Sequence, residues 1–554
     1  MTAHVDPKAG RPVEPDALID VPRLLEAYHA RQPDAGDPAQ RVAFGTSGHR
    51  GSALTGTFNE NHVLAICEAI CRHRKAAGVD GPLFLAGDTH ALSAPAIATA
   101  LEVFVAQGVT VMLDARDGFT PTPAVSHAIL RHNRGRERGL ADGVVLTPSH
   151  NPPQDGGLKY NPPHGGPAEP DVTNAIERLA NAALAAGPQR IRRIPYARAV
   201  RAPEALRYDY RAPFVAELAE VVDLPAIRAA GVRIGIDPLG GASAEYWPLV
   251  LEAYGLEGAV VSDVVDPRFA FMTADHDGEI RMDCSSPYAM ARLVGLRDRF
   301  DVAFGNDPDA DRHGIVTPGE GLIEPNRYLT AVVAFLYAHR PAWPAGLAIG
   351  KTMVTTALID RLAIRLQRPL LETPVGFRWF VDGLSSGALG FAGEESAGAV
   401  FRRRDGTLWT TEKDGFTLGL LAAEMIARTG EDPGAIYRAV TAGLGASHYA
   451  RLDAPASPEQ KARLKALTPG DLGLSRLAGE RVLAVETASP GGQPFGGVRV
   501  RAESGWFAAR PSGTEALYKI YAESFRDLHH LSGIQEVARN ALEQALAGSG
   551  GVPP

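Results

Sequence analysis

Ser149 stands in a segment that combines a potential nucleophile with a stiff backbone. A strand-like run, ADGVVL, is followed by TPSHNPPQDGGLKYN. Prolines on both sides of Ser149 and His150 forbid helix and ladder pairing, so we expect Ser149 on a rigid, exposed loop. A serine in that setting can act as a nucleophile if a base takes its proton, or carry a phosphate if a cation neutralises the ester. The alternative is a plain proline-rich turn.

The end of the same segment brings a basic residue within reach of the serine. The Gly-Gly pair in GGLKY lets the backbone fold back, which would place Lys159 near Ser149. A desolvated lysine beside other cations can lose its proton near neutral pH. Lys159 is therefore our first choice for general acid–base work.

A second segment, DVAFGNDPDADRHGIVT, carries three aspartates at alternate positions between two strand-like runs. Carboxylates so close together repel one another unless a cation lies among them. In an extended strand, residues two apart are about 6.6 Å apart, so the loop must curl to bring Asp307, Asp309 and Asp311 together. Three protein oxygens leave an open coordination position, which predicts Mg²⁺ shared with a phosphate.

The aspartate loop allows two other interpretations. The first is a solvated acidic turn. The second is a calcium EF-hand, because Gly314 and Glu320 fall at positions six and twelve when the motif starts at Asp309. However, His313 occupies position five, Pro318 falls inside the loop, and strands flank it, so the EF-hand is excluded.

Four further Gly-rich or hydroxyl-rich turns could meet an anionic sugar. They are FGTSGHRG at 44–51, TPVGFRWF at 373–380, GEESAG at 393–398 and ARPSGTE at 509–515. The first, second and fourth carry Arg50, Arg378 and Arg510, and an arginine with backbone amides is good material for a phosphate site. DPLGGAS lacks the G-x-G-x-x-G spacing, which excludes a nicotinamide site.

The elements that must position these loops follow a repeated pattern. Apolar strands at 83–90, 232–243 and 346–354 each lead through a polar loop into a helix and a new strand. Such β-loop-α-β units require mostly parallel pairing, and three copies at uneven intervals predict three related α/β domains.

The last hundred or so residues have a different pattern. VLAVETA, GVRVRAE, GWFAAR and ALYKIYAE are short strands joined by Gly-rich turns, flanked by helical runs near 457–467 and 533–546. This pattern predicts an α+β domain with an antiparallel sheet. We expect domains at 1–205, 206–321, 322–443 and 444–554, with the first 40 residues lying loosely on the surface.

Composition limits the class of protein. A net charge of −8 argues against a general nucleic-acid or anionic-membrane surface. Three cysteines cannot form a disulfide framework, and Cys67 and Cys71 fall in an apolar run as buried thiols. Without a signal peptide or a run of about 20 apolar residues, we expect a cytoplasmic protein, monomeric or homodimeric.

Taken in order, the motifs FGTSGHRG, TPSHNPP, GLKYN, DPDADR, TPVGF, GEESAG, EKDG and RPSGTE resemble those of the α-D-phosphohexomutase family, in its bacterial glucose-specific type. The resemblance spans about residues 40 to 525. It implies three related α/β domains and a smaller α+β domain around a central cleft. It also implies reversible interconversion of α-D-glucose 1-phosphate and D-glucose 6-phosphate through a phosphoserine enzyme and glucose 1,6-bisphosphate.

The resemblance assigns a role to each motif. Ser149 would be the phosphoserine, and Mg²⁺ would be held by Asp307, Asp309, Asp311 and a phosphate oxygen on Ser149. The groups around the transferring phosphoryl would be Arg50, His150, Lys159 and Arg312, with Lys413 aiding proton transfer or phosphate contact. The sugar would face Thr373, Gly376, Glu394 and Ser396. The phosphate that is not reacting would be held by Arg510, Ser512, Gly513 and Thr514. Arg378 stands where the family has lysine, which changes the geometry of that contact.

Two positions distinguish the substrate branches. Relatives acting on mannose or glucosamine phosphates tend to have Met or Gln and then His where this chain has Glu395 and Gly398. Other functions left open are turnover of mannose or glucosamine phosphates, a Mg²⁺-dependent phosphatase, and a silent sugar-phosphate binder, although a binder needs no acceptor serine. Because the intermediate must turn without escaping, the C-terminal domain is expected to act as a lid.

Overall fold

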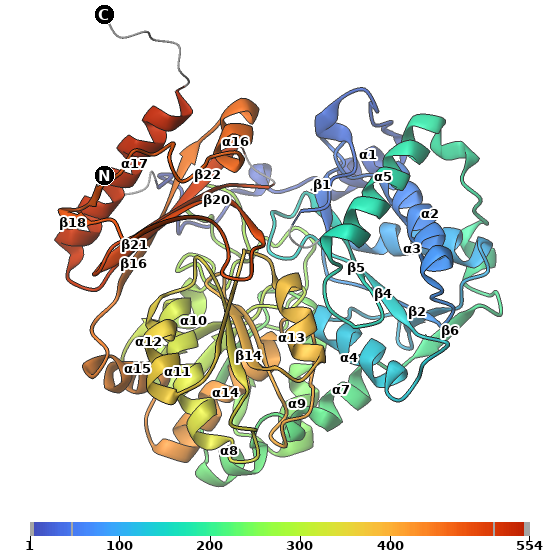
Figure 1. The fold of residues 1–554 in the computed structure, drawn as a ribbon. Helices are drawn as coiled ribbons and strands as arrows, with labels where there is room; N and C mark the ends of the chain where they lie inside the picture. The colour runs from blue at the N-terminus through green and yellow to red at the C-terminus, as the bar shows by residue number, and fades with distance from the viewer. Residues whose placement is uncertain (1–4, 46–47, 514–515, 548–554) are drawn as a thin grey trace, which may run out of the picture.

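The chain folds into four domains, each built around its own main sheet (Figure 1). The computed structural model describes residues 5–45, 48–513 and 516–547. In Figure 1 the blue-to-cyan domain lies at the right, the green and yellow domains lie below, and the orange-to-red domain lies at the upper left. The first three sheets contain parallel pairs, and the fourth is antiparallel. The predicted fold class is confirmed.

The first domain has three layers. Its sheet runs, in spatial order, through β1 (His49–Ser52), β5 (Asp155–Asn161), β4 (Asp142–Leu146), β2 (Leu83–Gly87), β3 (Val111–Asp114) and β6 (Ala205–Tyr208). Its main helices are α2 (Glu60–Ala77), α3 (Ser93–Ala106), α4 (Thr122–Asn133), α5 (Pro170–Ala186) and the short α6 (Tyr196–Ala199). Along β2, Leu83 and Leu85 join a cluster with α2, α3 and α5, whereas Phe84 and Ala86 pack with α4. Both faces of this sheet are therefore covered.

The second and third domains repeat the parallel plan. The second sheet contains β11 (Gly321–Leu322), β10 (Gly314–Thr317), β9 (Val302–Gly305), β7 (Ile234–Asp237) and β8 (Gly258–Val260), with α7 (Arg211–Glu217), α8 (Leu224–Ala230), α9 (Trp247–Tyr254) and α10 (Ala291–Gly295). The third sheet contains β13 (Leu370–Thr373), β12 (Ala348–Thr352), β14 (Leu389–Glu394) and β15 (Gly398–Phe401), with α11 (Pro325–His339), α12 (Leu358–Leu366), α13 (Val381–Ser385), α14 (Gly415–Thr429) and α15 (Pro433–Ala442).

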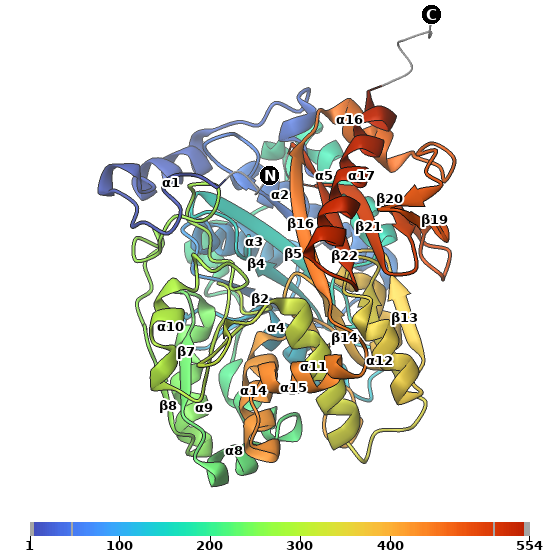
Figure 2. The ribbon, with the colours of Figure 1, turned by 90° about the vertical axis from the view of Figure 1, so that its left-hand side faces the viewer.

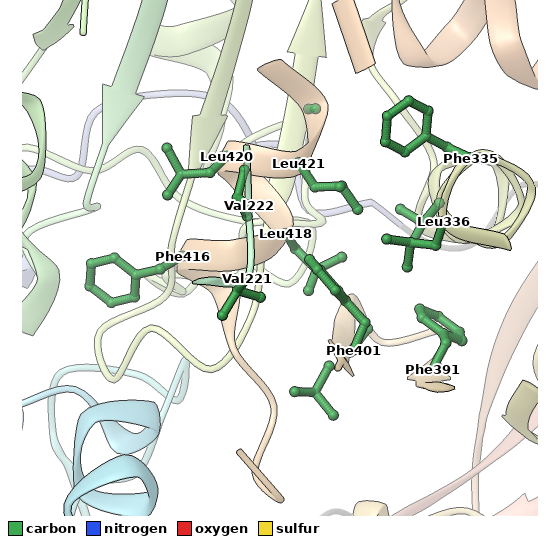
Figure 3. Packing of buried hydrophobic residues seen from close by; sticks show 14 of the residues in the cluster. Val221, Val222, Phe335, Leu336, Phe391, Phe401, Phe416, Leu418, Leu420 and Leu421 are labelled. Atoms are coloured by element: carbon green, nitrogen blue, oxygen red, sulfur yellow. The ribbon is translucent and has the colours of Figure 1, made fainter. Parts of the chain in front are cut away.

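These two domains share one hydrophobic core. Helix α14 belongs to the third domain in sequence, yet it contacts α8 and β9 of the second. Figure 3 shows its side chains Phe416 and Leu418 beside Val221, while Leu421 points toward Leu336 of α11. Since burying apolar surface stabilises by about 25 cal/mol per Å², this shared core joins the two domains into one body.

The fourth domain is an antiparallel sheet backed by two helices. Its strands are β16 (His448–Pro455), β22 (Leu517–Ser524), β21 (Gly505–Pro511), β20 (Pro494–Arg501) and β19 (Ala484–Ala488), and a small hairpin pairs β17 (Arg476–Leu477) with β18 (Glu480–Arg481). In Figure 2, α17 (Leu528–Leu546) crosses in front of β21 and β22, and α16 (Pro458–Lys465) lies at the top. Strand β16 was not predicted from the sequence. Its alternating Ala450, Leu452 and Ala454 pack against the core of this domain, but none of its residues is fully buried.

The N-terminal segment is more ordered than predicted. Helix α1 (Val21–Ala30) buries Leu24 and Tyr28, one turn apart, in the core of the first domain. The Tyr28 hydroxyl donates to Thr99 Oγ1 at 3.0 Å. Further upstream, Asp6 N donates to the His276 carbonyl at 2.8 Å. The expectation of a loosely attached segment was wrong for these residues, because two apolar side chains on one helix face suffice to anchor it.

None of the helices in the described ranges combines the length and the apolar composition that spanning a bilayer requires. The three domain boundaries, near residues 205, 321 and 443, stay predictions.

Glu217, at the end of α7, ties the first three domains together. It accepts a hydrogen bond from the Arg403 guanidinium at 2.5 Å, just after β15. His127 Nε2 and Arg131 Nε, both on α4, lie 3.1 and 3.4 Å from its carboxylate. Burial raises the pKa of Glu217, but hydrogen bonds from His127 and Arg403 outweigh it and lower the pKa to about 2.

We predict that Glu217→Gln lowers the free energy of unfolding at pH 7 by about 1–3 kcal/mol. A depressed pKa means that this stabilisation is complete above the unfolded value and is lost as pH falls toward 2. The difference between wild type and variant should therefore be constant from pH 7 to about 5 and narrow below 4.5. Urea titrations at several pH values measure it. Glu252→Gln, at an exposed position on α9, is the control, and an equal loss in both variants would contradict the prediction.

Candidate active site

The loop after β4 brings Ser149 against the aspartate loop of the second domain. Ser149 adopts a left-handed backbone conformation, with φ of 60°. Its Oγ donates to Asp307 Oδ2 at 2.7 Å, a contact between residues 158 positions apart. Ser149 is only 1% exposed, so the expectation of an exposed loop was wrong. The proline-bounded bend is present, but the aspartate loop of the neighbouring domain covers it.

The aspartate loop curls as its spacing required. Ala310 takes a φ of 54°, and one carboxylate oxygen from each of Asp307, Asp309 and Asp311 lies within 4.8 Å of the others. All three residues are buried. Asp309 Oδ1 and Asp311 Oδ1 have no hydrogen-bond partner among the described residues. Burial, and then repulsion from the other two aspartates, raises the pKa of Asp307 well above its usual range. Buried, unsatisfied carboxylate oxygens are the donor set that a hard divalent cation takes.

Two lysines from different domains reach the same carboxylates. Lys159 Nζ, on β5, lies 2.6 Å from Asp309 Oδ2 and 2.9 Å from Asp311 Oδ2. Lys413 Nζ, just before α14, lies 2.9 Å from Asp311 Oδ2. Burial lowers the pKa of Lys159, but Asp309 and Asp311 outweigh it and the net shift is upward. This is opposite to the lowering expected from the sequence, because the nearest charges are anions rather than cations.

Arg50, His150 and Arg312 complete the basic side of the site. Strand β1 pairs antiparallel with β5 and sets Arg50 opposite Gly157, and the Arg50 guanidinium donates to Asn151 Oδ1 at 3.1 Å. Arg312 Nε lies 3.9 Å from Asp311 Oδ1. His150 Nδ1 lies 3.4 Å from Ser149 Oγ. Burial and then Arg312 lower the pKa of His150 well below its usual value, so its ring is neutral.

The two loops assigned to the sugar are joined to each other. Glu394, at the end of β14, accepts a hydrogen bond from Gly376 N at 3.0 Å. Thr373 ends β13 beside this contact, and its hydroxyl donates to the Pro374 carbonyl. Ser396 follows in the turn between β14 and β15 and is partly exposed.

Two arginines from different domains form a third basic group. Arg378 follows the turn after β13, and Arg510 lies near the end of β21. Among the described residues the Nε atoms of both are buried without a hydrogen-bond partner. The pKa of Arg378 is lowered by burial, and the nearby charge of Arg510 lowers it further. Ser512 and Gly513 follow Arg510, whereas Thr514 lies outside the described residues. Unsatisfied guanidinium donors with like charges side by side favour an anion between them.

Thr122 and Glu412 belong to the site but were not predicted from the sequence. Thr122, at the start of α4, donates from Oγ1 to Asp309 Oδ2 at 2.6 Å across 187 residues. Glu412 is buried, and its carboxylate lies 3.6 Å from Lys413 Nζ. The motif TEKDG offered a signal for Glu412, since it adjoins a singled-out lysine. Nothing local distinguishes Thr122, because its partner lies in another domain.

Comparison with known proteins gives consistent matches. Three stretches match the descriptions phosphoglucomutase/phosphomannomutase alpha/beta/alpha domain I (41–186), domain II (212–320) and domain III (324–442). A phosphoglucomutase of Komagataeibacter xylinus is 57% identical over 544 residues, covering 98% of both chains. A solved structure assigned as a phosphomannomutase of Thermus thermophilus has a TM-score of 0.69 at 27% identity, covering 91% of this chain and 99% of that one. Parafusin, a Paramecium phosphoglucomutase, shares the fold, with a TM-score of 0.72 at 20% identity, covering 93% of this chain and 96% of that one.

We predict that Asp309→Asn weakens divalent-cation binding at least ~10-fold, because it removes one of three anionic ligands. Calorimetric titration of the wild type and the variant with MgCl₂ measures this. The cation should also raise the melting temperature of the wild type and leave that of the variant nearly unchanged. Asp301→Asn, which affects a partly exposed ion pair with Arg233, is the control. Equal affinities in wild type and Asp309→Asn would remove the loop from metal binding.

Proposed function

The chain belongs to the phosphoglucomutase/phosphomannomutase family, and we propose that it is a phosphoglucomutase, which interconverts α-D-glucose 1-phosphate and D-glucose 6-phosphate. The observation that carries the proposal is the 2.7 Å contact between the Ser149 hydroxyl and Asp307 of the aspartate triplet. A phosphate acceptor and a cation-binding set meet there at the boundary of two domains. The 57% identity over nearly the whole chain supports the same substrate.

Ser149 serves as the phosphoryl carrier in the proposed reaction. The phosphorylated serine gives its phosphoryl group to the free oxygen of either glucose phosphate, and glucose 1,6-bisphosphate is the product of that transfer. After the bisphosphate has turned in the site, Ser149 Oγ accepts the other phosphoryl group. The number of phosphoryl groups is thus conserved, and either monophosphate can leave. Glucose 1,6-bisphosphate is also the activator that rephosphorylates a free serine.

Charge around the transferring group is the main catalytic requirement. Phosphoryl transfer depends chiefly on positioning and on neutralising the phosphoryl oxygens. A Mg²⁺ held by Asp307, Asp309, Asp311 and a Ser149 phosphate oxygen would supply that neutralisation when bound. Lys159, Lys413 and Arg312 already lie within 4 Å of the triplet. The bound phosphoryl group gives these cations a second anionic partner.

The far end of the substrate is assigned to the arginine pair. Arg378 and Arg510 carry buried Nε donors that have no hydrogen-bond partner among the described residues, and they approach from the third and fourth domains. A phosphate between them would satisfy both, with Ser512 and Gly513 following Arg510 in sequence. Thr514, assigned to the same phosphate, lies outside the described residues. Glu394 and Ser396, with the turn at Thr373 and Gly376, then face the sugar hydroxyls between the two phosphates.

The attachment of the fourth domain supports its role as a lid. Its core is separate from the shared core of the second and third domains. A small apolar cluster, including Met353 and Trp506, spans the boundary. Polar contacts accompany it, as where Arg499 donates twice to Glu372 at 2.6 and 2.7 Å. Such a boundary allows rotation that closes Arg510 over a substrate and excludes water from the phosphoserine.

The compartment and assembly state are part of the proposal. Cys67, Cys71 and Cys284 are free thiols, which supports a cytoplasmic, reducing environment. We keep a monomer or homodimer acting on small sugar phosphates.

Ser149→Ala should lower mutase turnover by at least ~10³-fold, because the variant lacks the oxygen that carries the phosphoryl group. A coupled assay of glucose 6-phosphate formation from glucose 1-phosphate measures it. Intact mass after incubation with glucose 1,6-bisphosphate should show one added phosphoryl group in the wild type and none in the variant. Normal turnover in the variant, or release of inorganic phosphate faster than isomer formation in the wild type, would overturn the proposal. Mannose and glucosamine 1-phosphates assayed alongside should turn over more slowly than glucose 1-phosphate.

Arg378→Leu should raise the KM for glucose 1-phosphate about 10- to 100-fold, the value of a charge-assisted hydrogen bond of ~1.5–3 kcal/mol. Arg378→Lys keeps the charge and loses the planar fork, so its effect should be smaller. Arg365→Leu, at an exposed position on α12, is the matched control. An unchanged KM in Arg378→Leu would remove this residue from the substrate site.

A further inference from the structure

A buried polar cluster contacts the loop that carries Ser149. It is formed by Asp88 and His90, just after β2, together with Thr147 at the end of β4. Strands β2 and β4 are parallel neighbours, so their carboxyl ends meet at one edge of the sheet. Asp88, His90 and Thr147 are 1%, 2% and 0% exposed.

The hydrogen bonds of Thr147 can run in only one direction. The Thr147 hydroxyl donates to Asp88 Oδ2, and a carboxylate can only accept. With its single proton committed to Asp88, Thr147 Oγ1 turns a lone pair toward Ser149 and accepts the Ser149 N–H at 2.8 Å. A left-handed backbone costs a non-glycine residue roughly 1–2 kcal/mol, and this bond helps to hold Ser149 at its φ of 60°.

His90 contacts the loop on the C-terminal side of Ser149. Its backbone N–H donates to Asp88 Oδ1 at 3.0 Å, and its Nδ1 lies 3.0 Å from Asp88 Oδ2. Its Nε2 lies 3.1 Å from the Asn151 carbonyl oxygen. Both ring nitrogens face acceptors, so both must carry protons and the ring is an imidazolium. Asn151 in turn accepts from the Arg50 guanidinium, which extends the cluster to the substrate side.

We propose that Asp88 and His90 are positioning residues for phosphoryl transfer, which hold the residues before and after Ser149 so that its Oγ meets the aspartate triplet. The inference rests on the proposed function. Neither side chain is assigned contact with substrate, and both act through Thr147 and Asn151. Because misplacing a reacting group by about 1 Å can cost a factor of about 100 in rate, the cluster controls kcat rather than substrate affinity.

Asp88→Asn tests the proposal with almost no change in shape. Both Asp88 oxygens accept: Oδ2 from Thr147 and His90 Nδ1, and Oδ1 from the His90 N–H and Ser93 Oγ. The NH₂ group of an asparagine would face donors in either orientation, so hydrogen bonds that hold the cluster in place are lost. We expect kcat to fall about 10- to 100-fold with KM within about 3-fold of wild type. Single-turnover phosphorylation of Ser149 by glucose 1,6-bisphosphate, followed by intact mass, should slow by the same factor.

Two further comparisons separate positioning from general stability. Thr147→Ser keeps the hydroxyl and should stay within about 3-fold of wild-type kcat, whereas Thr147→Val should match Asp88→Asn. Asp142→Asn affects another buried aspartate of the same domain, at the opposite end of β4, where Asp142 pairs with Arg74 and Tyr160. It should lower the melting temperature and leave kcat within about 3-fold of the wild-type value.

The outcomes are distinguishable. Full kcat in Asp88→Asn, equal losses in Thr147→Ser and Thr147→Val, or an equal loss in Asp142→Asn would each overturn the positioning role. A wild-type protein without mutase turnover would instead overturn the proposed function.

Discussion

The arrangement of the rest of this structure depends on three buried carboxylates in one loop. Asp307, Asp309 and Asp311 are at most 1% exposed, and charges in a dry interior interact far more strongly than in water. Two lysines that pair with these carboxylates come from different domains: Lys159 from the first and Lys413 from the third. Docking of these domains therefore relieves part of the repulsion, in addition to Arg312 of the same loop. Assembly of the domains and assembly of the charged site are the same event.

The contacts between domains differ in extent. The second and third domains share a core, and Glu217 joins them to the first through Arg403 and α4. These contacts fix Lys159, Lys413 and the aspartate triplet relative to one another. The fourth domain carries Arg510 and keeps its own core. In the proposed function, the joined domains carry the groups assigned to the transferring phosphoryl, and the separately packed domain carries Arg510, which is assigned to the distant phosphate.

Backbone strain occurs at three points where the loops of the site converge. Three non-glycine residues with positive φ lie in these loops: Ser149 at 60°, Ala310 at 54° and Ala397 at 66°. Each conformation costs of order 1–3 kcal/mol and persists only when its surroundings hold it. Backbone hydrogen bonds hold two of these residues. Gly415 N donates to the Ala310 carbonyl, and His313 N donates to the Ala397 carbonyl. The aspartate loop and the sugar loop therefore support one another.

Much of the fold could be predicted from the sequence, because its signals are local. Apolar runs ending in glycine turns identified the strands and helices of the three parallel units, and their alternation determined the fold class. Proline around Ser149 and the alternate aspartates drew attention to the two central loops through backbone stiffness and charge repulsion, and the order of the motifs favoured a functional site over plain turns. Strand β16 gave a weaker signal, an alternation of small apolar and polar residues, and its place in the sheet comes from pairing with β22.

Only the tertiary structure determined those properties that depend on neighbours distant in sequence. Ser149 is buried rather than exposed, and the pKa of Lys159 is raised rather than lowered. Thr122 reaches Asp309, and Asp88 lies behind Thr147. The physical reason is common to all of them. Residue type and spacing determine what a side chain can donate, accept or repel, but burial and the electrostatic environment depend on which other segments pack against it, and those segments lie tens to hundreds of residues away.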